Sequence, residues 1–276
     1  MTDLLDNPAV QAALVPFAVA LVLGLLLCRT RFLAVAVISG VLVVMALTVG
    51  LSPDPLTSVK KLVLSAIVVT ALALGLEGAG TTAGRASIVA LSSISGVGAV
   101  WVILRVLQQM ESFRPWMIGA AALMFVLVTV ASALATGATS SLRGAVVGAC
   151  LGWGSGVLAL LGASALLAQI GLAVGTACAA VALVQMVRGE SPLGWTLVAP
   201  AAVTAGLVGV LASATGELRW YCLIPLLFAP FAARWAPVGA GRPAWQRALA
   251  TGAAAALPVA LAVGMAWWSA ALPSAG

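Results

Sequence analysis

Residues that could do chemistry are few in this sequence, and no acidic residue lies within two positions of another. Glu77 follows the apolar run from Ala71 to Leu76 and precedes Gly78-Ala79-Gly80. A carboxylate at the end of an apolar helix can be shielded from water, where it can bind and release a proton. Glu77 is therefore the best single candidate for ion coupling. The alternative is a carboxylate that simply ends a helix in solvent.

The next predicted helix carries a cation and several hydroxyls. Arg105 follows an apolar stretch, so its guanidinium could contact an anionic substrate group or extend to the lipid headgroups. Ser92 and Ser95 share one face of this helix. They could line a polar cavity or donate hydrogen bonds to carbonyls of their own helix. Glu77 and Arg105 are predicted at opposite ends of adjacent antiparallel helices, so we expect no ion pair between them.

Glycine recurs at every fourth position in one apolar stretch. Such a stripe without side chains lets another helix approach closely. It predicts helix packing within the chain, or an interface with a second copy or another membrane protein. The stripe consists of Gly144, Gly148, Gly152 and Gly156.

Several classes of function are disfavoured by composition. The chain has no histidine, the commonest metal ligand and proton shuttle. Its four cysteines form no CxxC pair and are predicted to be small buried side chains. DDxxD, HExxH and phosphate-binding glycine loops are absent from the sequence. Basic residues form no stripe that could follow a nucleic-acid backbone. We therefore expect no enzymatic activity, metal, cofactor or nucleic-acid partner.

The elements that must position these residues are membrane helices. Hydrophobic residues make up 63% of the chain and charged residues 7%. The apolar residues come in continuous blocks of about 20, which match the hydrocarbon core of a bilayer and favour helices over an alternating barrel. The predicted fold is an all-α polytopic membrane helix bundle of nine or ten spans, ten being preferred. The predicted spans are 9–28, 32–51, 62–76, 86–104, 116–137, two between 144 and 187 with a turn near 162–164, 195–214, 220–236 and 248–272.

The loops between these spans are short, so residues 1–276 are predicted to form one integral membrane domain without a soluble domain. Halves at 1–140 and 141–276 would hold five spans each. Since an odd number of spans reverses direction, a repeat would be inverted. The layout resembles that of five-plus-five drug/metabolite exporters in length and number of spans.

Basic residues in alternate loops predict the orientation. One side would carry eight of them and the other five. The positive-inside rule places the richer side in the cytoplasm and both termini on the outer face, as in a bacterial inner membrane protein. The richer side holds Arg29, Arg31, Arg85, Arg143, Arg188, Arg234, Arg242 and Arg247.

Tryptophan and proline give two further expectations. Seven tryptophans near span ends are predicted to anchor the helices at the membrane interfaces: Trp116, Trp195, Trp220, Trp235, Trp245, Trp267 and Trp268. Five prolines are predicted inside spans, where each can kink a helix: Pro16, Pro200, Pro225, Pro230 and Pro258.

Two functions from different classes fit this pattern. The first is a permease for a small apolar or weakly polar molecule, since few charges are available to bind an ion. The second is a non-catalytic scaffold or accessory subunit of a membrane protein complex, because short loops and a glycine stripe suit helix packing.

Overall fold

The computed structural model describes residues 10–30, 32–50, 52, 54–80, 84–110, 114–162, 164–191, 195–215, 218–237 and 241–271. In these residues the secondary structure is helical, with no strand. Eight helices are long and apolar enough to cross a membrane. The chain is therefore an all-α integral membrane protein, which confirms the predicted fold class.

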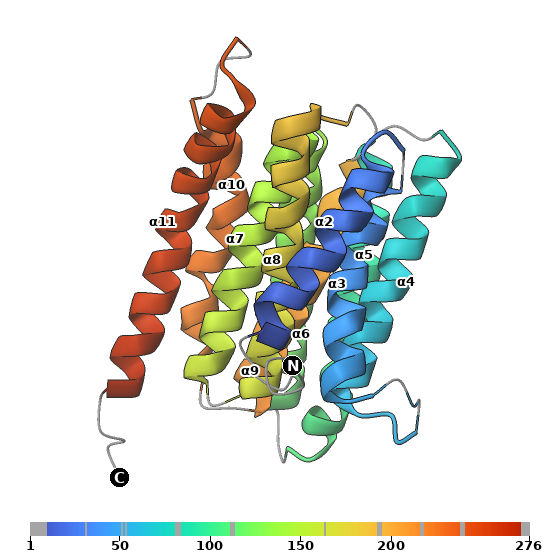
Figure 1. Ribbon diagram of the computed structural model, residues 1–276. Helices are drawn as coiled ribbons and strands as arrows, with labels where there is room; N and C mark the ends of the chain where they lie inside the picture. Colours follow the sequence, from blue (N-terminus) through green and yellow to red (C-terminus); the bar gives the residue numbers. More distant parts are fainter. Residues whose placement is uncertain are drawn as a thin grey trace.

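Each of the ten predicted spans corresponds to a helical segment in the described part of the chain, and successive segments run in opposite directions (Figure 1). Two of these segments are not among the eight long helices: α3, with 16 residues, and the combination of η3, η4 and α10. The segments are η1 (Val10–Leu14), α2 (Val15–Leu27), α3 (Leu33–Thr48), α4 (Ser58–Gly78), α5 (Arg85–Gln108), α6 (Arg114–Gly137), α7 (Ser141–Leu161), α8 (Ala165–Arg188), η2 (Trp195–Val198), α9 (Ala199–Thr215), η3 (Trp220–Leu223), η4 (Pro225–Phe228), α10 (Ala229–Trp235) and α11 (Ala244–Ala271).

Hydroxyl side chains fix three of the helix starts. Thr57, Ser140 and Ser164 precede α4, α7 and α8, and each accepts a hydrogen bond from the backbone N–H three residues later. Such caps satisfy N–H groups that have no partner within the helix. The cap at Ser164 starts α8 directly after α7, which confirms the tight turn predicted between them.

Helix α9 lies at the centre of the bundle and is buried along nearly its whole length. It packs against α4, α5, α6, α7 and α8. Helices α2 and α3 pack against α8, so segments from the two predicted halves interlock. Helix α11 lies at the edge, against α7 and α10, and is the least buried of the long helices (Figure 1).

The predicted prolines lie within the spans, mostly where one type of helix changes to another. Pro16 and Pro200 lie inside the spans Val10–Leu27 and Trp195–Thr215, each in the second residue of the α-helix that continues a π-helix or a 3-10 helix. Pro225 and Pro230 lie at the starts of η4 and α10, within the predicted ninth span. Pro258 lies inside α11. Each proline lacks the N–H that would continue the helical hydrogen bonds, so the changes of helix type coincide with the missing donors.

Candidate functional site

Two groups of polar side chains lie at one end of the bundle, where α4 and α8 end and α7, η2 and α11 begin. This end is at the top in Figure 1 and is called the upper end. The first group centres on Glu77, in the last turn of α4, which is only 3% exposed. Its Oε2 accepts a hydrogen bond from the hydroxyl of Thr196 in η2. The carboxylate thus lies inside the bundle, and the solvent-exposed alternative is wrong.

The burial of Glu77 follows from the pattern of α4. Every fourth residue from Lys61 through Ser65 to Glu77 is buried. Four residues exceed one helical turn by about 40°, so this line winds around the helix. It faces α5 at its start, where Lys61 lies over Trp101, and η2 at its end. The winding therefore brings a carboxylate into the protein interior.

The partner of Glu77 belongs to an irregular helix start. Segment η2 is a 3-10 helix that leads directly into α9. Pro200 has no N–H, so it cannot donate the α-helical hydrogen bond to the carbonyl of Thr196. The change from 3-10 to α-helix thus coincides with the contact to the buried carboxylate. Segment η2 also packs against α3, α6 and α7, which enclose it.

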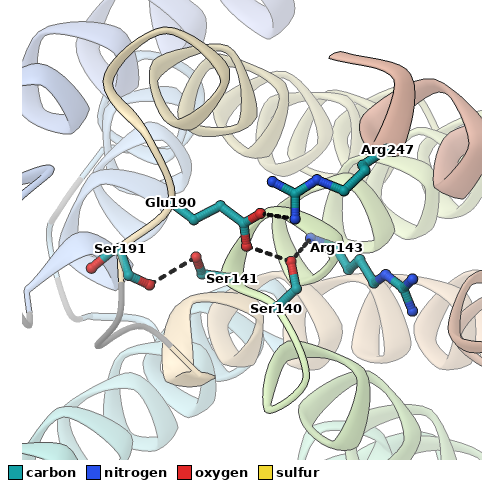
Figure 2. A network of polar contacts seen from close by, with 6 residues as sticks. All are labelled: Ser140, Ser141, Arg143, Glu190, Ser191 and Arg247. Carbon is teal, nitrogen blue, oxygen red and sulfur yellow. Dashed lines mark hydrogen bonds and ion pairs between the residues drawn. The ribbon is translucent and has the colours of Figure 1, made fainter. Parts of the chain in front are cut away.

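The second group centres on Glu190, in the loop that follows α8 (Figure 2). Its Oε1 lies 2.5 Å from Nη1 of Arg247 in α11. Its Oε2 accepts a hydrogen bond of 2.6 Å from the hydroxyl of Ser140, which also caps α7. Gly189 precedes it with φ of 91°, a left-handed conformation that favours glycine. This turn directs the chain from α8 toward Ser140 and Arg247.

Two further contacts join neighbouring elements to this network. The hydroxyl of Ser141 donates to the carbonyl of Ser191 at 3.0 Å (Figure 2). The guanidinium of Arg143 donates to the carbonyl of Arg234, in the last turn of α10, at 3.2 Å. The network therefore connects α7, the loop after α8, α10 and α11 at the upper end.

Sequence reasoning did not single out Glu190 or Gln185. Glu190 occurs in a short polar loop, and nothing in the sequence identified Ser140 and Arg247 as its partners. Gln185 is in α8 and is 1% exposed, and neither atom of its amide has a hydrogen-bond partner among the described residues. A glutamine within an otherwise apolar run was the only available signal. Buried amides usually have partners, so this side chain is a candidate for contact with a ligand or water.

The candidates on α5 have simpler roles. Ser92 donates to the carbonyl of Val89 at 3.0 Å, and Ser95 donates to that of Leu91 at 2.7 Å. Both hydroxyls therefore bond to carbonyls of their own helix, which was the predicted alternative to lining a polar cavity. Arg105 is exposed in the last turn of α5, at the lower end of the bundle. As expected, it lies at the opposite end from Glu77 and forms no ion pair in the described part of the chain.

The glycine stripe packs against other helices of the same chain. A Cβ atom on Gly152 would lie 2.4 Å from the backbone N of Gly175, and one on Gly156 would lie 2.8 Å from the N of Leu172. Both contacts are with α8. A Cβ on Gly148 would lie 2.8 Å from Sγ of Cys178, also in α8, and one on Gly144 would meet Gly137 of α6. Close packing is confirmed, and the stripe is not free to form a subunit interface.

Most of the predicted interface tryptophans are exposed, with Trp116 at 79% and Trp235 at 81%. Trp220 is partly buried, and Trp195 is only 9% exposed, because it starts η2, which packs against α3, α6 and α7. The indole N–H of Trp195 has no hydrogen-bond partner in the part of the chain that the structure describes. This residue is therefore part of the interior of the upper end and not of an aromatic belt.

In the described residues no group of three histidine, cysteine, aspartate or glutamate side chains could hold a metal ion. All four cysteines are free; Cys178 and Cys222 are buried, and Cys28 and Cys150 are partly buried. Comparisons with models of protein families, with curated proteins and with solved structures found no match.

Proposed function

We propose that this protein is a permease for a small, uncharged, apolar or weakly polar molecule, without enzymatic activity. The observation that carries the proposal is the carboxylate of Glu77, 3% exposed inside a membrane helix bundle. Ionisable side chains are expensive within a membrane and tend to mark pathways for protons, ions or substrates. A purely structural helix contact would not need one.

The contact with Thr196 suits a group that changes protonation. A hydroxyl can donate to a carboxylate and can accept from a carboxylic acid. Thr196 can therefore serve Glu77 in both states. Its position in a 3-10 turn ahead of α9 supports the same proposal, because transporter sites often lie at interrupted helices. Proton binding at Glu77 would then be coupled to rearrangement of η2.

The proposal also assigns the orientation. The alternating helices place the two predicted sets of basic residues at opposite ends of the bundle, except Arg31, which lies outside the described residues. By the positive-inside rule the upper end would face the cytoplasm of a bacterium, and both termini would be outside. Reporter fusions after Gly276 test this assignment. Activity of a reporter that works only in the cytoplasm would reverse it.

Proton movement in proteoliposomes tests the function. Vesicles containing a pH-sensitive dye would receive a panel of small uncharged compounds, with and without an imposed pH gradient. At least one compound should move protons in the wild-type protein, and Glu77→Gln at equal abundance should abolish that movement. Asp54→Asn is the matched control, because Asp54 is an exposed carboxylate at the other end of α4. Unchanged proton movement in Glu77→Gln would remove this residue from the mechanism.

The second candidate is a scaffold or accessory subunit of a membrane complex, and the exposed apolar face of α11 favours it. Leu257 and Trp268 are 74% and 71% exposed, and a partner helix could cover them instead of lipid. Purification at native expression separates the two candidates. A stoichiometric membrane partner supports the scaffold. Thermal stabilisation of the isolated protein by a transported compound supports the permease.

A further inference from the structure

A groove of about 480 Å³ lies between α5 and α6 at the lower end of the bundle, away from both polar groups. This volume is in the range of small-molecule sites, which is about 300–1,000 Å³. Its walls are almost wholly apolar. They include Val100, Leu104 and Leu107 of α5, and Gly119, Ala120 and Leu123 of α6.

Small side chains create this groove. Higher in the pair the helices touch, since a Cβ on Gly96 would lie 3.0 Å from the carbonyl oxygen of Leu123. Lower down, Gly119 and Ala120 leave space, and a Cβ on Gly119 would meet only the end of the Leu107 side chain, at 3.4 Å. The groove is thus built into the sequence of α6 and opens on the exposed side of the bundle.

One polar and one aromatic side chain line the groove, and a cationic side chain lies next to it on α5. Gln108 lines it from the last residue of α5, and Trp116, 79% exposed, lines it from α6. Arg105 is exposed one turn before Gln108, so the two side chains are neighbours on the helix surface. Tryptophan prefers the headgroup region, and arginine pairs well with phosphate. An apolar groove with an exposed guanidinium beside it matches an amphiphile with an anionic head.

We propose that the α5–α6 groove is a binding site for an anionic phospholipid of the bilayer. One acyl chain lies along the apolar walls, and the phosphate meets the guanidinium of Arg105 with Gln108 as a further donor. The charge of Arg105 selects the headgroup, since the apolar walls make no distinction between lipids with the same chains. The site is independent of Glu77 and of the proposed transport.

Lipid titration of the purified protein followed by native mass spectrometry tests this site. The two probes are phosphatidylglycerol and phosphatidylcholine with identical acyl chains. One basic residue near a membrane surface corresponds to a preference of about fivefold for the anionic lipid. Arg105→Gln should abolish this preference. Arg188→Gln is the matched control, because Arg188 is exposed at the upper end, and it should keep the preference.

A second variant tests the apolar part. Ala120→Leu places a larger side chain in the groove at an exposed position and should weaken the binding of both lipids. Ala256→Leu, at an exposed position of α11, should leave binding unchanged. Equal affinity of the wild-type protein for both lipids would overturn the proposal. So would an undiminished preference in Arg105→Gln, or unchanged lipid binding in a folded Ala120→Leu protein.

Discussion

The carboxylate of Glu190 reaches from the loop after α8 to the guanidinium of Arg247 in α11, with 2.5 Å between Oε1 and Nη1. Both side chains are less than one-third exposed. This ion pair attaches the least buried long helix to the loop that leads into the most buried one. The second oxygen of Glu190 accepts a hydrogen bond from Ser140, so one carboxylate joins three segments that are distant in sequence.

Breaking this ion pair should destabilise the protein. Arg247→Gln leaves Glu190 with a partly buried charge, and the free energy of unfolding should fall by about 1–3 kcal/mol. Thermal unfolding in detergent measures the change. The double variant with Glu190→Gln should lose less than the two single variants together, because the second change removes a charge that has already lost its partner. Additive losses would show that the two side chains do not interact.

The glycine contact between α7 and α8 should not tolerate even a methyl group. In Gly152→Ala the new Cβ would lie 2.4 Å from the N of Gly175, so backbone must move. Overpacking of this kind lowers the free energy of unfolding by about 1–3 kcal/mol. Gly264→Ala is the control, since a Cβ on Gly264 of α11 would meet no described atom from outside its own stretch of helix within 4 Å. A melting temperature equal to that of the control would contradict the close contact.

Continuous apolar blocks and the charges between them were enough to predict the helices of this fold. They could not show which loops meet. Ser140 and Glu190 lie far apart in the sequence, and their contact depends on the return of α8 to the end at which α7 starts. The burial of Lys61 has a similar origin. It lies near the start of α4, after the N-cap residue Thr57, where a lysine is usually exposed to solvent, yet α5 places Trp101 beneath it.

The candidate site was predictable only in part. Glu77 was found because a carboxylate after an apolar run is unusual, whereas its partner Thr196 gave no signal. Trp195 was assigned to the interface because it begins a span, and composition cannot reveal that η2 packs against α3, α6 and α7. The glycine stripe predicted a close helix contact, but it could not show which helix makes the contact. The tight turn before α8 brings a helix of the same chain against the stripe.

Gln185 offers a test of the upper interior. Neither amide atom has a hydrogen-bond partner in the described residues, so Gln185→Leu should raise the free energy of unfolding by about 1–3 kcal/mol. Gln169→Leu, at a partly exposed position of the same helix, should have little effect. Thermal unfolding of both variants provides the comparison. A lower melting temperature for Gln185→Leu would mean that the amide has a partner in the working protein, such as bound water or a ligand.

The ammonium of Lys61 lies 5.2 Å from the ring centroid of Trp101, and the side chain is 8% exposed. Desolvation of the charge opposes the attraction of the ring, so the effect of Lys61→Met alone has no fixed sign. A double-mutant cycle with Trp101→Leu isolates the pair, and the coupling should be about 0.5–2 kcal/mol. The control is the same cycle with Lys60→Met in place of Lys61→Met. The Nζ of Lys60 lies 3.4 Å from the carbonyl oxygen of Asp54 and does not lie over the ring of Trp101. Strict additivity of Lys61→Met and Trp101→Leu in thermal unfolding would rule out the cation–π contact, and the burial of Lys61 would then have to come from its apolar stem alone.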